Sequence, residues 1–203
     1  MTRKPDEEPD LKLVEELIFA PKGLALQRFS HSETVTGRTP DFRVLRKGKL
    51  AAFCEVKSPR DDWLDNQLDV APPLELVGGL RPDPTFNRVA RHVEKAATQF
   101  DAVNADLAVP NILVFVNHDR ASHFGDLRET LTGMFHAEGG ERFETMNYIS
   151  EGRLAEPKKR IDLYAWIDGR KKRVQGYLFN EAVPARVTGI CELLGLDASK
   201  IRH

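Results

Sequence analysis

Two extended runs on either side of a glycine constrain this chain more than any other feature. Residues 41–45 and 50–57 read as strands, and they flank the segment Arg46-Lys47-Gly48-Lys49. Glycine permits the positive φ that a tight reversal needs, so the pattern predicts an antiparallel hairpin. Gly48 is seven residues from Asp41 and seven from Glu55. A hairpin centred on Gly48 would therefore set these two acids opposite one another.

The hairpin also predicts a chemistry. Side chains alternate along a strand, so Glu55 and Lys57 are expected on one face, with Cys54 and Val56 on the other. Facing carboxylates repel one another unless a cation lies between them, and Mg²⁺ is held by one or two carboxylates with waters and substrate phosphate. We therefore expect a Mg²⁺ site, with Mn²⁺ as a substitute. Lys57 would supply positive charge where negative charge develops during phosphodiester hydrolysis.

Hydrophobic periodicity predicts the other elements of residues 10–117. They are a helix at 10–19, a strand at 24–30, a helix at 87–104 and a strand at 111–116. Prolines at 59, 72, 73, 82 and 84 and the pair Gly78-Gly79 predict an irregular connection over 58–86. The order helix, three strands, helix, strand indicates an α/β fold around one sheet.

The second part of the chain reads as a C-terminal elaboration over residues 118–203. It is predicted to hold a helix at 124–136, a hairpin across 161–179 that turns at Asp168-Gly169, and a helix at 184–195. A chain of 203 residues is long enough to bury a sizeable core. We expect a single domain over residues 1–203.

Pro40-Asp41, followed by Glu55-Val56-Lys57 at the end of the next strand, resembles the signature of the PD-(D/E)xK nuclease superfamily. The resemblance covers about residues 10–117. It implies a restriction-endonuclease-like αβββαβ core with a central mixed sheet flanked by helices. By this resemblance Asp41 and Glu55 would be metal ligands, as would the backbone carbonyl of Val56. Lys57 would position or activate the attacking water.

The resemblance implies two further site residues. Families of this group often add an acid from the first helix, and Glu15 lies at the edge of that helix's apolar face, with Glu16 further toward solvent. Many also place a polar residue on the helix after the motif, where Gln99 is the candidate. The tyrosine found four residues later in the RecB-like form of the motif is absent, because position 103 is valine.

Several basic residues are candidates for nucleic-acid contact. Arg88, His92, Lys95 and Gln99 recur at helical spacing along one polar stripe, and Arg60 follows Lys57 closely. A solvated helix face is the alternative explanation of the stripe. The runs 158–160 and 170–173 are also basic, and each by itself is typical of a solvated turn.

Composition limits the partners. The 30 basic and 31 acidic residues nearly cancel, so DNA affinity would have to come from a local patch, a homodimer or a partner protein. No apolar run approaches the roughly 20 residues needed to cross a bilayer, so no membrane partner is expected. Two distant cysteines, Cys54 and Cys191, fit a reduced cytoplasmic protein.

Three functional hypotheses follow from the sequence. The first is a Mg²⁺-dependent deoxyribonuclease, of the endonuclease type, that uses Asp41, Glu55 and Lys57. The second is a catalytically inactive module with the nuclease fold that binds nucleic acid or a protein partner. The third is an unrelated metal-dependent hydrolase built around His118 and His123, which lie near Asp119.

Overall fold

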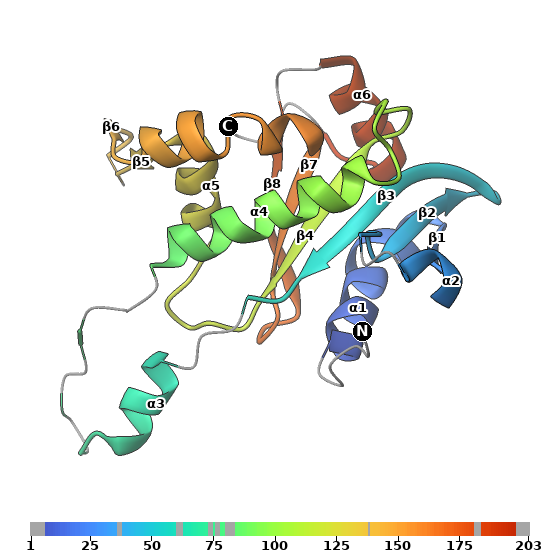
Figure 1. The fold of residues 1–203 in the computed structure, drawn as a ribbon. Helices are drawn as coiled ribbons and strands as arrows, with labels where there is room; N and C mark the ends of the chain where they lie inside the picture. Colours follow the sequence, from blue (N-terminus) through green and yellow to red (C-terminus); the bar gives the residue numbers. More distant parts are fainter. Residues whose placement is uncertain are drawn as a thin grey trace.

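Six strands form one mixed sheet in the order β1-β2-β3-β4-β7-β8 (Figure 1). The computed structural model describes residues 7–35, 38–59, 63–72, 75, 78–79, 84–137, 139–180 and 184–197. The strands of this sheet are β1 Leu24–Arg28, β2 Phe42–Arg46, β3 Lys49–Lys57, β4 Asn111–Asn117, β7 Leu163–Asp168 and β8 Arg173–Phe179. A separate two-stranded sheet consists of β5 Met134–His136 and β6 Arg142–Glu144.

Helices cover both faces of the large sheet (Figure 1). The α-helices are α1 Glu8–Val14, α2 His31–Thr34, α3 Trp63–Val70, α4 Thr85–Asp101, α5 Phe124–Thr132 and α6 Pro184–Leu194. The π-helices are η2 Glu15–Phe19 and η4 Tyr148–Arg153, and the 3₁₀-helices are η3 Ala20–Lys22 and η5 Pro157–Arg160.

Strand direction decides which helices share a face. β3, β4 and β7 are parallel neighbours, so the chain crosses over twice in the same direction along the sheet. Such crossovers are right-handed in nearly all proteins, which puts both connections on one face. Accordingly Val93 of α4, Leu127 of α5 and Ile149 of η4 share one core cluster. Leu11 of α1 and Ile190 of α6 belong to the cluster on the opposite face.

β4 is the central strand, and all seven of its residues are buried. Parallel strands with helices on both faces have this continuous burial. Its neighbour β3 is buried only in its second half, from Ala52 to Lys57. The predicted site residues Glu55 and Lys57 therefore lie in the buried half of β3.

The predicted α/β class, with a central mixed sheet flanked by helices, is confirmed. Three predicted elements need correction. The helix predicted at 124–136 ends at Thr132, and Met134–His136 forms the strand β5. Residues 58–86 are not uniformly irregular, because the segment 63–70 contains neither proline nor glycine and forms α3. The hairpin across 161–179 is not a separate addition, because β7 pairs with β4 and extends the central sheet. Among the described residues, no helix has the length and apolar character needed to span a membrane.

Candidate functional site

The β2–β3 turn has two residues, Lys47 and Gly48, and both have positive φ, 51° and 76°. A turn of this kind matches the right-handed twist of the strands that it joins. Arg46 and Lys49 form the last pair before the turn. The hairpin is therefore centred between Lys47 and Gly48, which corrects the prediction that it is centred on Gly48.

A bulge restores the predicted facing of the two acids. The pairing shifts by one residue within the hairpin and leaves Ala51 as the extra residue of β3. Beyond the bulge Phe42 lies opposite Cys54. One step further along the same register, Asp41 adjoins Glu55. The turn is centred slightly before Gly48, and the extra residue at the bulge shifts the strand pairing back. The two deviations cancel, so Asp41 still faces Glu55.

Asp41 binds the backbone of β3 directly. Its Oδ2 accepts a hydrogen bond of 2.8 Å from the backbone N–H of Val56. The N–H and C=O of a strand residue point toward the same neighbouring strand, so the Val56 carbonyl also faces the beginning of β2. The register would set Pro40 opposite Val56, and proline has no N–H to donate. The proline thus provides no ladder bond to that carbonyl.

Glu55, Lys57 and Gln99 form one buried polar group on the α4 face of the sheet. Lys57 Nζ donates to Glu55 Oε1 and, over 2.8 Å, to Gln99 Oε1. Gln99 Nε2 in turn donates to the carbonyl of Thr39 over 2.9 Å. Glu55 is 2% exposed and Lys57 is 8% exposed. The amide of Gln99 therefore joins the lysine to the segment that leads into Asp41.

The expected alternation along β3 is also observed. Cys54 and Val56 point into the cluster on the α1 face, whereas Phe53 belongs to the cluster on the α4 face. Asp41 is half-buried, so it is the acid of the site nearest to solvent.

The pKa of Glu55 is raised to about 7, chiefly by burial and also by the neighbouring carboxylate of Asp41, while Lys57 and Gln99 oppose the shift. Within the described part of the chain, Glu55 Oε2 is buried and has no hydrogen-bond partner. A buried acceptor without a partner is costly. Such an oxygen, beside a second carboxylate, suits a hard divalent cation that prefers oxygen ligands.

His92 lies on α4 next to this group. Its ring packs edge-on against Phe115, with ring centroids 6.2 Å apart. Burial lowers the pKa of His92 to about 4, and the positive charge of Lys57 contributes to the shift. His92 is therefore neutral near pH 7, so it adds no cation to the basic stripe along α4.

The other predicted contact residues have different environments. Arg88 forms an ion pair of 3.1 Å with Asp119, which is 5% exposed. Lys95 is exposed on the surface of α4. Arg60 lies outside the described residues. The stripe therefore holds one buried ion pair, one neutral imidazole and one exposed cation.

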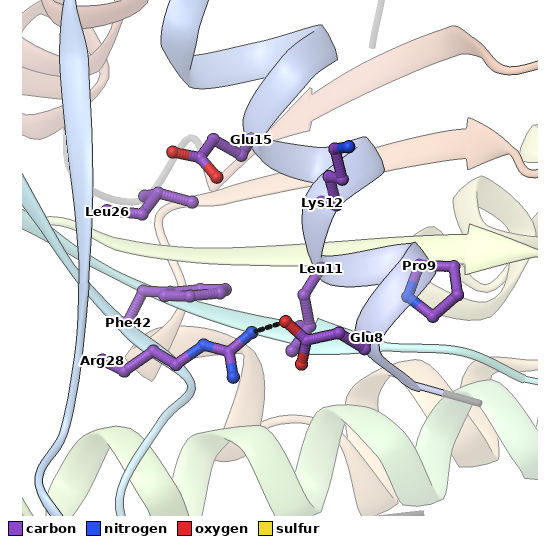
Figure 2. A pocket seen from close by; sticks show the side chains of 8 residues that line it. All are labelled: Glu8, Pro9, Leu11, Lys12, Glu15, Leu26, Arg28 and Phe42. Carbon is purple, nitrogen blue, oxygen red and sulfur yellow. Dashed lines mark hydrogen bonds and ion pairs between the residues drawn. The ribbon is translucent and has the colours of Figure 1, made fainter. Parts of the chain in front are cut away.

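Glu15 does not join Asp41 and Glu55. It lines a surface pocket of about 620 Å³ between α1 and the strands β1 and β2 (Figure 2). Figure 2 shows its carboxylate beside Leu26. Phe42, which also lines this pocket, belongs to the core on the α1 face. The pocket is thus on the opposite face of the sheet from Glu55.

The two histidines of the third hypothesis are held by different acids. His118 Nε2 lies 2.9 Å from Asp10 Oδ1, and His123 Nδ1 lies 3.7 Å from Asp126 Oδ2. Across the residues that the structure describes, no three His, Cys, Asp or Glu side chains gather into a metal-holding group. This geometry gives no support to a histidine-based metal centre.

Sequence reasoning missed Thr39, which fixes Gln99 through its backbone carbonyl. A carbonyl is present at every position, so it has no signature in a sequence. It considered Asp119 only beside His118 and His123 and missed its contact with α4: the carboxylate of Asp119 accepts from Arg88 and from Ser122. The proximity of Asp119 to a helix far away in the sequence follows only from the crossover between β3 and β4.

A scan against protein-family models, a search of the curated proteins and a search of the solved structures each found no match to this chain.

Proposed function

We propose that this chain is a metal-dependent nuclease that hydrolyses phosphodiester bonds in DNA, built on a restriction-endonuclease-like αβββαβ core. One observation carries the proposal. Asp41 adjoins Glu55 at the end of the hairpin, Glu55 Oε2 is buried without a hydrogen-bond partner among the described residues, and Lys57 lies on the same face. Two carboxylates and a lysine in this arrangement suit charge stabilisation at a phosphate.

Three groups of the chain would hold the metal ion: the Asp41 carboxylate, Glu55 Oε2 and the carbonyl of Val56. Mg²⁺ usually keeps several waters and takes one or two carboxylates, so a site with two acidic side chains is sufficient. When bound, Mg²⁺ polarises the phosphate and lowers the pKa of a coordinated water. The positive charge of the bound ion would also balance the negative charge of Asp41, which raises the pKa of Glu55.

Lys57, Gln99 and His92 would determine the position of positive charge in the site. Lys57 would place its ammonium where the phosphate gains negative charge. Gln99 holds that ammonium by one hydrogen bond and the backbone before Asp41 by another, which limits the freedom of both. Neutral His92 beside Lys57 adds no competing positive charge near pH 7.

A second candidate is a catalytically inactive nuclease-fold module that binds nucleic acid or a protein partner. The ion pair between Lys57 and Glu55 favours it, because both side chains are almost fully buried and neutralise one another. The two candidates make opposite predictions about metal-dependent cutting of DNA.

The test is incubation of the purified protein with plasmid and linear DNA in Mg²⁺, Mn²⁺ or chelator. We expect cutting only with metal, and a rate lower by at least about 100-fold in Asp41→Asn, Glu55→Gln and Lys57→Met, because each removes a charge-stabilising group. Glu16→Gln, which neutralises an exposed acid on the other face, is the control and should cut normally.

Equal cutting by the wild type and the three site variants would reject the proposal, provided that circular dichroism shows all of them folded. Retention of DNA in a gel shift without any metal-dependent cutting by the wild type would favour the binding module instead.

A further inference from the structure

Four consecutive basic residues, Arg170-Lys171-Lys172-Arg173, span the turn between β7 and β8 and the first residue of β8, and all four are exposed. We call this segment the 170–173 turn. Because β3, β4 and β7 are parallel, their carboxyl ends lie at the same edge of the sheet, and the turn follows β7 at that edge. Figure 1 shows the tip of this hairpin at the end of the sheet toward which β3 points.

Strand register gives the distance from the candidate site. Lys57 is paired with Phe115, and Phe115 is paired with Trp166, so the three form one row across three strands. Strands lie about 4.8 Å apart, which puts Trp166 about 10 Å from Lys57. Asp168 is two residues further along β7, so the turn begins about 12 Å from Lys57.

The base of the turn is fixed to the end of β4. Asp168 Oδ1 accepts hydrogen bonds from the backbone N–H groups of Arg170 and Lys171, over 3.1 and 3.0 Å. The N–H of Gly169 donates to the carbonyl of Asn117 over 2.8 Å. The basic side chains therefore project from a backbone with a defined position, which lowers the entropy cost of binding through them.

The other basic run, residues 158–160, differs from the 170–173 turn in its location and in its ion pairs. Residues 158–160 precede β7, at the opposite edge of the sheet. Each of its cations has an acidic partner: Lys158 pairs with Glu151, Lys159 with Glu156 and Arg160 with Asp101. By contrast, Lys171, Lys172 and Arg173 form no ion pair with an acidic side chain of the described residues, although Asp168 is the cross-strand neighbour of Arg173. Of the two runs, therefore, only the 170–173 turn has cations, Lys171, Lys172 and Arg173, without an ion-pair partner among the described residues.

We propose that the 170–173 turn binds the phosphate backbone of the DNA that the candidate site cuts. The inference rests on the proposed function, because its distance is measured from Lys57. A separation of about 12 Å corresponds to three or four base pairs along a duplex. The net charge of the chain is −1, so a local cluster of this kind has to supply the attraction to DNA.

The test variant carries Lys171→Gln, Lys172→Asn and Arg173→Gln. Asparagine is chosen at position 172 because that residue has φ of 49°, which asparagine tolerates better than most residues. Arg170 is left unchanged.

The β2–β3 turn offers a matched control with Arg46→Gln, Lys47→Asn and Lys49→Gln. It has the same three charges, all exposed, and a lysine with φ of 51°. Lys49 is eight residues before Lys57 on β3, so this turn lies about 26 Å from the site, at the other end of the strand (Figure 1).

Binding is measured by fluorescence anisotropy of a labelled duplex in chelator, over a series of salt concentrations. Each lost phosphate contact should reduce the slope of log K against log salt by about 0.9 and weaken binding about tenfold at 0.1 M salt. We expect the 170–173 variant to lose one to three such contacts and the control variant to lose none. Equal weakening of both variants, or unchanged binding of the 170–173 variant, would overturn the inference.

Cutting in Mg²⁺ is measured in parallel, which separates the two proposals. If the 170–173 variant cuts DNA at the wild-type rate and binds it normally, the proposed docking surface is rejected and the proposed nuclease function is retained. Binding that depends on the turn, in a wild type that never cuts, would support the surface and reject the nuclease.

Discussion

The side chain of Glu55 is buried beside a second carboxylate and a single lysine, so the polar group has more acids than cations. Lys57 neutralises one oxygen of Glu55, and the other oxygen has no hydrogen-bond partner in the described residues. Such an arrangement costs stability in the metal-free protein whenever Glu55 is ionised. This cost is a measurable consequence of the site, independent of any activity.

The first prediction is a pH dependence of stability. The pKa of Glu55 is raised to about 7 in the folded protein from a usual value of 4.5. Between these pH values the folded state therefore binds more protons than the unfolded state. The stability that protonated Glu55 contributes is fully present below pH 4.5 and is lost as the pH rises through about 7. In thermal melts, Glu55→Gln should gain stability relative to the metal-free wild type between pH 5 and pH 8.

The same melts in Mg²⁺ provide the control. Metal binding needs the carboxylate, so Mg²⁺ should raise the wild-type Tm above pH 7 more than below it, and should have little effect on Glu55→Gln. A difference between variant and wild type that does not change with pH would show that Glu55 titrates normally.

At the scale of residues, the sequence was sufficient to bring Asp41, Glu55, Lys57 and Gln99 into one hypothesis, because strand alternation and helical spacing are local rules. It was not sufficient for Glu15. The helical pattern correctly associates Glu15 with the rim of an apolar face, but which face of the sheet that helix covers is decided by long-range packing.

At the scale of elements, short-range signals succeeded where one residue type dominates the local geometry. Gly48 predicted the hairpin, and the periodic apolar residues of α4 predicted that helix. The bulge at Ala51 has no local signature, because it arises from the fit between the turn and the paired strands. The sequence pattern does not reveal α3, because the prolines on both sides of it predict an irregular segment, although they lie outside its eight residues.

The second prediction concerns how the β7–β8 turn is held. A Cβ added at Gly169 would come within 2.6 Å of the His118 ring. Gly169→Ala should therefore lower the free energy of unfolding by about 1–3 kcal/mol, as overpacking usually does. In a His118→Ala background the ring is gone, and the same substitution should cost less than about 1 kcal/mol.

Urea denaturation of the wild type, the two single variants and the double variant completes the cycle. Additive effects of the two substitutions would mean that the added Cβ at position 169 does not clash with the His118 ring.

At the scale of the whole molecule, the sequence predicted the class of fold but not the extent of the sheet. The hairpin across 161–179 was recognised from its turn, yet its pairing partner β4 lies about 50 residues earlier in the chain. No local pattern identifies such a partner. The location of the two basic runs at opposite ends of β7 depends on that same pairing, so the sequence alone does not distinguish their surroundings.

The third prediction is a gradient of hydrogen exchange across the sheet. β4 is buried along its full length and paired on both sides, whereas β1 and β8 are the outer strands. Backbone amides of β4 should exchange only by global unfolding, and those of β1 and β8 by smaller openings. Mass spectrometry of exchanged peptides would measure this order. Equal protection of β8 and β4 would argue against the edge position of β8.

α4 is bonded at both of its ends to parts of the molecule that matter for the proposals. Gln99, near its C-terminal end, holds Lys57 and the backbone before Asp41, while Arg88, near its N-terminal end, holds Asp119 in the loop after β4. A helix of 17 residues is about 26 Å long and stiff. A displacement of the loop after β4 along the helix axis would therefore also displace Gln99 and the side chains that it holds.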